Sequence, residues 1–485
     1  MKELFTSLRL GETWIPNQGR YSDFIKSFTE VSEAYYGRKL SSEARDIWRE
    51  SQLRQVLQKV SSSSRFYKQH FEGIDLSSIH HNDLTGLPFT TKDDLRREMF
   101  DILSGDVSEA VYFYETTGTT GRATPCPRDG KEIIASNAHV TESWRAIFKY
   151  HFGDHKPMIG LMGPTEVHSF GDTLGEVARN VGSCNAKIWP YSPVIGFKKA
   201  LQLMKDLKLE VVVATPGVCL NLARAASYYG YDIQKDFDAL KLFFVTGEMC
   251  TPALAENIDS LWGVTTYNIL YGSQEAFVMA TASPSRKMRF ADINYIAEVI
   301  EPESGKSLGD RGTGELCVTM LADGIKPLVR YRTGDMVTIE DDDNSEIDQP
   351  GPIIEVIGRV LDRIKLGDNF FTAGSLEQAV LEGITHCYGY QLVIDQEDGQ
   401  DVLTVRMQFS EIPKQWPVLE RAIVQRVKEK FNISSQVVVV ENLDDIVSTG
   451  AFVSWKAARI VDNRREKNHE EQVAAEMSKN RGIDR

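Results

Sequence analysis

The chain of 485 residues has only six cysteines, and no two of them form a Cys-x-x-Cys pair. They stand apart at positions 126, 184, 219, 250, 317 and 387. This spacing fits neither a disulfide framework nor a zinc site. It favours reduced thiols in a cytoplasmic protein.

Long apolar runs and a surplus of positive charge are also missing. No segment approaches the ~20 uninterrupted apolar residues of a membrane span, and the N-terminus lacks a signal-peptide core. Asp and Glu number 69 against 55 Lys and Arg, a formal net charge of −14. This balance argues against a general nucleic-acid binder and against an anionic membrane as partner. We therefore expect a cytoplasmic protein that binds neither nucleic acid nor membrane.

The length exceeds one ordinary core, so we expect two or more domains. Strand-like runs at 158–162, 211–214, 241–245 and 266–270 alternate with helix-length stretches. Such alternation between 110 and 300 predicts a largely parallel sheet, whose ligands lie at the carboxyl ends of its strands.

From about 290 to 357 the pattern becomes rich in strands, and a short αβ module with a polar tail follows Gly358. The sequence thus predicts an α/β protein. Its large N-terminal domain, 1–358, would hold parallel α/β sheets plus a β-rich subdomain. Residues 359–485 would form a small, mobile α+β C-terminal domain.

A stretch rich in Thr and Gly, Thr116-Thr117-Gly118-Thr119-Thr120-Gly121-Arg122, follows a strand-like run at 111–114. Its glycines let the backbone approach a ligand, and its hydroxyl and N–H groups can wrap phosphate oxygens. No Gly-Lys-Ser/Thr closes it at the spacing of a Walker loop. The segment alone leaves two interpretations open, a phosphate-binding loop and a polar hairpin turn.

Further motifs follow in a fixed order: Tyr271-Gly272-Ser273-Gln274-Glu275, Tyr331-Arg332-Thr333-Gly334-Asp335, Gly358-Arg359 and Lys456. Their order and gaps resemble the adenylate-forming superfamily of acyl- and aryl-CoA ligases, peptide-synthetase adenylation domains and luciferases. The segments 87–96 (LPFTTKDDLR) and 456–464 (KAARIVDNR) narrow the resemblance to the phenylacetate-CoA ligase branch. The similarity covers roughly residues 35–464.

This resemblance implies a site for ATP. The β- and γ-phosphates would be held by Thr116, Thr117, Gly118, Thr119, Thr120, Gly121 and Arg122. Tyr271 would stack near the adenine, with Gly272 and Ser273 beside it. Gly247 and Glu248 resemble the adenine-side strand end of the family, and Arg359 would reach ribose or phosphate.

Three charged residues would carry the chemistry. Glu275 offers a hard carboxylate that suits Mg²⁺, which bridges phosphates. Asp335, expected to follow a tight turn at Thr333-Gly334, can accept bonds from both ribose hydroxyls. By position Lys456 matches the catalytic lysine of the family, whose ammonium binds the carboxylate and α-phosphate oxygens. The role of Arg332 stays open, and a structural partnership with a neighbouring carboxylate is one alternative.

The chain also departs from the family pattern. Trp455 stands where the family usually has glycine. Leu361, followed by Asp362, occupies the hinge position that usually holds Asp or Lys. That hinge lets the C-terminal domain rotate after adenylation for thiol attack, and either residue is a candidate pivot. Gly367 is retained where the family lets a pantetheine arm pass.

The acyl pocket is expected from segments 164–175, 215–222 and 271–279. The candidate linings are His168, Phe170, Thr215, Pro216, Gly217, Phe277 and Met279. Phe and Met favour an apolar or aryl acid, although such residues near strand ends also serve as plain core.

The leading hypothesis is an AMP-forming acid–thiol ligase, which converts a small carboxylic acid to acyl-AMP with ATP and Mg²⁺ and then to a thioester with coenzyme A. One alternative acceptor is the phosphopantetheine of a separate carrier protein in natural-product biosynthesis. Another alternative is a non-catalytic nucleotide-binding relative. The identity of the acid, the pathway and the oligomeric state, including a homodimer, stay open.

Overall fold

A computed structural model describes residues 18–116, 123–341, 348–360, 363–441, 443 and 459–464. Lys456, Leu361, Asp362 and the loop residues 117–122 therefore lie outside the described residues. By contacts between residues the chain divides into two compact units. The first unit comprises Met1–Lys156, Thr165–Cys184 and Ile269–Val356, and the second comprises Pro157–Pro164, Asn185–Asn268 and Ile357–Arg485.

Helices form the first described part of the first unit. They are α2 (Ser22–Tyr36), α3 (Ser42–Ser63), α4 (Arg65–His70) and α5 (Lys92–Glu98), with 3₁₀ turns at Gln18–Tyr21, Leu76–Ser78, Met99–Ile102 and Val107–Glu109. The side chain of Ser41 caps α3 by accepting a bond from the N–H of Ala44 at 3.1 Å. Leu53, Val56 and Val60 on one face of α3 are fully buried, so this face joins the core.

A seven-stranded sheet, in the order β11-β12-β13-β14-β10-β9-β8, forms the centre of the first unit. Its strands are β8 (Leu270–Ser273), β9 (Phe277–Ala282), β10 (Met288–Phe290), β11 (Tyr295–Ile300), β12 (Gly312–Met320), β13 (Tyr331–Glu340) and β14 (Ile353–Arg359). The pairs β8–β9, β9–β10, β10–β14, β11–β12 and β12–β13 run antiparallel. The parallel alternation expected up to residue 300 therefore ends at residue 268. The hairpin β1 (Tyr112–Glu115) and β2 (Pro125–Arg128), with helices α6 (Gly130–Phe152) and α7 (Ser169–Asn180), completes the unit.

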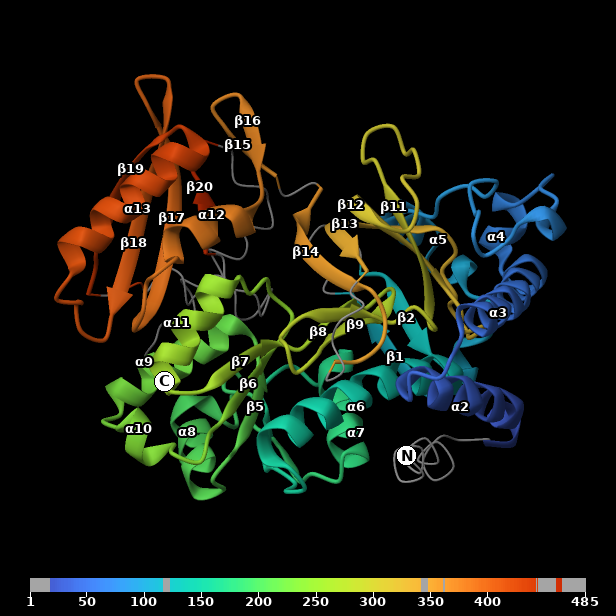
Figure 1. Cartoon of the computed structure of the whole chain (residues 1–485), viewed down its shortest axis with the longest axis horizontal. Helices are drawn as coiled ribbons and strands as arrows, with labels where there is room; N and C mark the ends of the chain where they lie inside the picture. Colours follow the sequence, from blue (N-terminus) through green and yellow to red (C-terminus); the bar gives the residue numbers. More distant parts are fainter. Residues whose placement is uncertain are drawn as a thin grey trace. The chain divides into compact units, whose positions relative to one another are not determined.

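The second unit contains the parallel sheet that the sequence predicts. Five strands pair in the order β4-β3-β5-β6-β7, all parallel. They are β3 (Ile159–Leu161), β4 (Asn185–Lys187), β5 (Val211–Ala214), β6 (Leu242–Val245) and β7 (Thr265–Asn268). The helices of this part are α8 (Gly196–Asp206), α9 (Pro216–Tyr228), α10 (Ile233–Asp236) and α11 (Pro252–Trp262). β5 and β6, which Figure 1 draws in green beside β7, are buried at every position, as is typical of strands in a parallel sheet.

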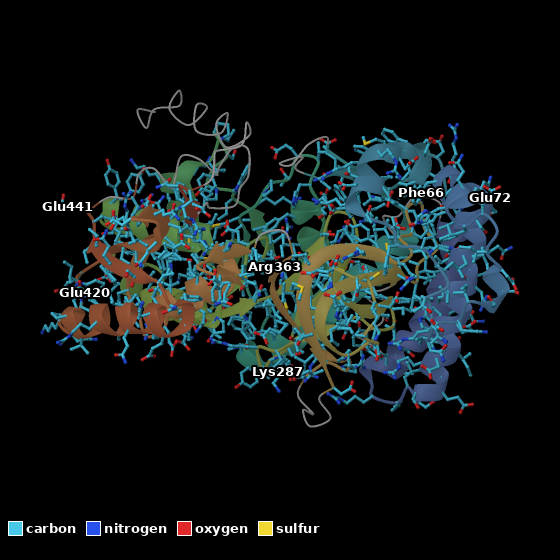
Figure 2. The ribbon with its side chains drawn as sticks, turned by 90° about the horizontal axis from the view of Figure 1, so that it is seen from above. Phe66, Glu72, Lys287, Arg363, Glu420 and Glu441 are labelled. Carbon is cyan, nitrogen blue, oxygen red and sulfur yellow. The ribbon has the colours of Figure 1, made fainter. Side chains whose placement is uncertain are left out.

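The end of the chain contributes an α+β portion to the same unit. It contains β15 (Ile364–Leu366), β16 (Asn369–Phe371), α12 (Ala373–Leu381), β17 (Cys387–Glu397), β18 (Gln400–Phe409), α13 (Trp416–Phe431), β19 (Ser434–Val439) and β20 (Ile460–Asp462). Four strands form a mixed sheet in the order β19-β18-β17-β20. Figure 2 labels Arg363 just before β15, Glu420 on α13 and Glu441 just after β19.

The core of the second unit is continuous across its two portions. Leu222 and Leu254 on α9 and α11 belong to the same buried cluster as Leu376 and Tyr390 on α12 and β17. Residues of the proposed C-terminal domain thus share a core with residues 185–268, while the division into 1–358 and 359–485 stays a prediction. The predicted fold class is confirmed, with a parallel α/β sheet, a β-rich sheet and an α+β portion. Within the described ranges, no helix combines the length and apolar composition needed to cross a membrane.

Candidate active site

The Thr/Gly-rich stretch connects the two strands of the β1–β2 hairpin. The N–H of Thr116 donates to the carbonyl of Thr124 at 3.1 Å, and the N–H of Thr124 donates to Oγ1 of Thr116 at 2.9 Å. These bonds close the base of the loop beyond the last strand pair, Glu115 with Pro125. Because residues 117–122 are outside the described part, phosphate binding by the loop stays a prediction.

The motif Tyr271–Glu275 runs from β8 into a tight turn. Ser273 Oγ accepts a bond from the N–H of Ala276 at 3.0 Å. Phe277 closes the turn with φ +69°, a backbone conformation that costs a bulky residue about 1–3 kcal/mol. The guanidinium of Arg128 lies 4.8 Å from the Phe277 ring centroid and donates to the carbonyl of Glu275 at 2.8 Å. These contacts hold the turn in its strained form.

Gly272 sits at a shift in the register between β8 and β9, where the two backbones approach closely. A Cβ atom at this position would lie 2.2 Å from the carbonyl oxygen of Phe277. We predict that Gly272→Ala lowers the free energy of unfolding by about 1–3 kcal/mol, because the backbone must move to admit the methyl group. Urea titration measures the effect. Gly19→Ala is the control, since no atom lies within 4 Å of its Cβ position, and an equal loss in both variants would refute the steric explanation.

Glu275 is an ionised carboxylate buried beside two lysines. Only 4% of the residue is exposed, and its Oε1 lies 3.1 Å from Nζ of Lys92. Burial works to raise the pKa of Glu275, but the ammonium groups of Lys92 and Lys326 outweigh it and lower that pKa from its ordinary value. The carboxylate is therefore charged at neutral pH, as a magnesium ligand must be.

The segment 87–96 carries part of the family resemblance, but nothing in the sequence marks Lys92 itself as a site residue. It is the first residue of α5, and Thr91 and Asp94 form a reciprocal capping box there. That cap fixes the first residue of the helix and therefore the backbone position from which the Lys92 side chain extends. The capping pattern Thr-x-x-Asp is visible in the sequence, but the ion pair with Glu275 is not.

The sequence gives no sign of the position of Lys326 either. Lys326 is fully buried, and its Nζ donates to the carbonyl of Pro125 at 2.8 Å and contacts Sγ of Cys126 at 3.1 Å. Both partners lie on β2, directly after the Thr/Gly-rich loop. A buried cation at the foot of the loop, with Lys92 nearby at Glu275, makes this part of the first unit suitable for a polyanionic ligand.

Tyr271 and Asp335, from different motifs, meet in the first unit. Tyr271 Oη donates to Oδ2 of Asp335 at 2.7 Å. The expectation that Asp335 follows a tight turn is wrong in one respect, since it lies inside β13. Arg332 pairs with Cys317 and Met336 pairs with Glu315, so Thr333, Gly334 and Asp335 bulge out of the strand.

Glu315 and Arg332 hold this bulge. Glu315 Oε1 accepts a bond from the N–H of Gly334 at 3.2 Å, and its Oε2 accepts from Nε of Arg332 at 3.0 Å. Gly334 adopts φ +77°, which favours glycine. Arg332 thus has the structural partnership with a neighbouring carboxylate that was one of its alternatives, and it lies three residues before Asp335 in the chain.

In the second unit, predicted residues meet at the carboxyl ends of β5 and β6. Thr215 caps α9 by accepting a bond from the N–H of Val218 at 3.2 Å, with Pro216 as the first helical residue. The carboxylate of Glu248 accepts a bond from the N–H of Gly217 at 3.3 Å. Gly247, with φ +85°, makes the turn after β6. The parallel sheet therefore gathers Thr215–Gly217 with Gly247–Glu248, as its topology predicts.

The remaining candidates have local roles. His168 caps α7, its Nδ1 accepting a bond from the N–H of Phe170 at 3.1 Å. Phe170, Phe277 and Met279 are buried, and Met279 belongs to the core cluster of the first unit. Arg359 is exposed at the end of β14, and Gly367 makes the turn between β15 and β16 with φ +58°. Contact of these residues with a substrate or coenzyme stays a prediction.

Comparison with known proteins identifies similar enzymes, although no family model matches the chain. It is 24% identical over 442 residues to a phenylacetate-coenzyme A ligase of Aromatoleum evansii, covering 87% of this chain and 96% of the relative. It is 25% identical over 441 residues to the phenylacetate-coenzyme A ligase of Escherichia coli (strain K12), covering 85% and 93%. The resemblance to this branch of adenylate-forming enzymes is thereby confirmed.

Solved structures agree on the fold. A 2-hydroxyisobutyryl-CoA ligase in its postadenylation state, bound to an acyl-AMP, matches with a TM-score of 0.73 at 17% identity, covering 91% of this chain and 93% of that one. The same enzyme with 2-HIB-AMP and CoA in its thioesterification state matches with a TM-score of 0.60 at 18% identity, covering 87% and 90%.

Proposed function

We propose that this relative of the phenylacetate-coenzyme A ligases activates an apolar or aryl carboxylic acid with ATP and then transfers the acyl group to the thiol of coenzyme A. The observation that carries the proposal is the bond between Tyr271 and Asp335. These two residues, 64 positions apart and both expected at the nucleoside, meet through their polar side chains. The assignment of a nucleotide site depends on Tyr271 and Asp335 lying next to each other.

In the first half-reaction the substrate carboxylate attacks the α-phosphorus of ATP, and pyrophosphate leaves. The chain must bring two anions together, so positioning and neutralisation of charge are its main tasks. Asp335 would accept bonds from the ribose hydroxyls, and Tyr271 fixes one of its oxygens. Lys456, matched by position to the family's catalytic lysine, would bind the oxygens on which charge develops.

Glu275 fits the role of a magnesium ligand. It is charged, and Mg²⁺ usually needs only one or two protein carboxylates in addition to phosphates and water. Among the described residues, no three His, Cys, Asp or Glu side chains gather in a metal-binding group. An ion brought by ATP would neutralise phosphate charge when bound. Lys92 would have to release Oε1 of Glu275 in exchange.

In the second half-reaction the thiol attacks the acyl carbon of acyl-AMP, the bond between the acyl carbon and the phosphate oxygen breaks, and AMP leaves. Gly367 stands where the resemblance implies passage of the pantetheine arm. It is exposed, and a Cβ at its position would have no atom within 4 Å.

The test is a panel of apolar, aryl and amino carboxylic acids, each incubated with ATP and Mg²⁺ while pyrophosphate release is measured. We expect release with apolar or aryl acids. Coenzyme A and a phosphopantetheinylated carrier protein are then compared as acceptors of the acyl group. If a thioester forms with the carrier protein but not with coenzyme A, the acceptor is the carrier protein. ATP binding with no pyrophosphate release for any acid would favour the non-catalytic alternative.

A further inference from the structure

Arg459 is a buried arginine that lies among side chains from distant parts of the second unit. Its Nη2 donates to Oε2 of Glu248 at 3.2 Å and to the carbonyl of Met249 at 3.1 Å. Its Nη1 donates to Oη of Tyr390 at 2.9 Å and lies 3.4 Å from Oε2 of Glu377. The side chain of Arg459 is only 10% exposed, so these partners replace most of the water that would otherwise solvate the guanidinium.

Both carboxylates around Arg459 are buried as well. The side chain of Glu248 is 4% exposed and that of Glu377 is 8% exposed. Oε1 of Glu377 accepts a bond from Thr251 at 3.0 Å, and its Oε2 accepts one from Tyr390. Burial works to lower the pKa of Arg459, but Glu377, Tyr390 and Glu248 outweigh it and raise that pKa, so the guanidinium stays charged. Removal of Arg459 would take the guanidinium away from both buried carboxylates, which is costly in a buried place.

Glu248 connects this cluster to the residues at the carboxyl ends of β5 and β6. The oxygen that binds Arg459, Oε2, also accepts the bond from the N–H of Gly217. The carboxylate thus faces protein donors from the start of α9 and from Arg459. It follows Gly247 at the carboxyl end of β6, where the nucleotide is expected to lie. A carboxylate at that position would repel the phosphates of ATP unless a cation neutralised it.

We propose that Arg459 is a positioning residue for nucleotide binding, which neutralises Glu248 and holds the ends of β5 and β6 in place. The inference rests on the proposed function, because it takes the end of β6 as part of the ATP site. It also changes the role of Glu248, which would act through Arg459 and Gly217 in addition to any contact with adenine. The sequence separation of Arg459 and Glu248, 211 residues, conceals this link in the sequence.

The test compares four full-length variants, Arg459→Met, Arg459→Lys, Glu248→Gln and the double variant Arg459→Met/Glu248→Gln. ATP affinity is measured by calorimetry, and KM for ATP and kcat by pyrophosphate release. We expect Arg459→Met to weaken ATP binding about 10- to 100-fold, because the buried carboxylate of Glu248 loses the guanidinium that neutralises it. The double variant should regain about tenfold or more of that loss, since removing the charge of Glu248 also removes the repulsion. Arg459→Lys should bind ATP better than Arg459→Met.

Arg426→Met is the matched control. Arg426 is a partly buried arginine of the same unit that donates to the carbonyls of Ala379 and Glu382 at 2.8 and 2.7 Å, two neutral acceptors. We expect it to bind ATP as the wild type does. A role of Arg459 in packing alone predicts no recovery in the double variant, and that result would overturn the inference. If Arg459→Met fails to fold, Arg459→Lys against Arg459→Lys/Glu248→Gln gives the same comparison.

Measurements on the wild-type chain distinguish a failure of the proposed function from a failure of the inference about Arg459. Absence of pyrophosphate release with every acid would contradict the proposed function without touching Arg459, because calorimetry with ATP still compares the variants. Normal turnover in the wild type with no recovery in the double variant would refute the inference alone.

Discussion

Lys456→Ala is expected to slow acyl-AMP formation by about 10²–10³-fold while ATP binds almost as tightly as before. The loss of a charge that acts at the transition state typically has an effect of this size. Lys456 stands at the position of the catalytic lysine in the segment 456–464, which resembles the C-terminal ending of the phenylacetate-CoA ligase branch. Single-turnover formation of acyl-AMP measures the chemical step, and calorimetry measures ATP affinity.

Lys428→Ala is the control for Lys456, because Lys428 is an exposed lysine on α13. It should leave both quantities unchanged. Near-normal pyrophosphate release by the Lys456 variant would remove this residue from the mechanism. An equal loss in rate and in ATP affinity would make it a ground-state ligand of ATP.

Asp335→Ala is expected to weaken ATP binding about 10- to 150-fold, with a smaller effect on the rate at saturating ATP. A hydrogen bond to a charged acceptor contributes about 1.5–3 kcal/mol, and Asp335 is expected to accept bonds from the ribose. Tyr271→Phe is the matched control, since it removes the 2.7 Å bond to Oδ2 but leaves the carboxylate. Titration with ATP and with 2′,3′-dideoxy-ATP separates the two contributions.

The dideoxy analogue gives the sharper comparison. If Asp335 binds the ribose hydroxyls, the wild type should bind the analogue more weakly than ATP. The Asp335 variant should bind the two nucleotides equally. Unchanged discrimination in the variant would show that the ribose assignment is wrong.

Much of the fold could be predicted because each strand carries its own signal. β5 is a run of buried Val residues, and its bounds, Val211–Ala214, equal the predicted range. The helix that follows begins at Pro216 after the capping Thr215, also a local pattern. Strand ends in a parallel sheet then meet by topology, so the grouping of Thr215–Gly217 with Gly247–Glu248 could be anticipated.

Features set by distant partners could not be predicted. The bulge that presents Asp335 depends on Glu315, which bonds Gly334 and Arg332 from the neighbouring strand. In the sequence, Thr333-Gly334 looks like an ordinary turn. Lys92 and Lys326 look like surface lysines for the same reason, since their partners Glu275 and Pro125 are far away in the chain.

The core that the second unit shares between its two portions has a consequence for synthesis. Asn257 on α11 exchanges two hydrogen bonds with the backbone of Cys387, which follows it by 130 residues. A ribosome that adds about 5–20 residues per second needs roughly 6–26 s to make that partner. During this interval α11 and the nascent parallel sheet lack the later portion of the chain, whose apolar side chains belong to the same buried cluster. Slow translation between these positions should therefore lower the yield of folded protein through aggregation, and a chaperone that holds apolar surface should restore it.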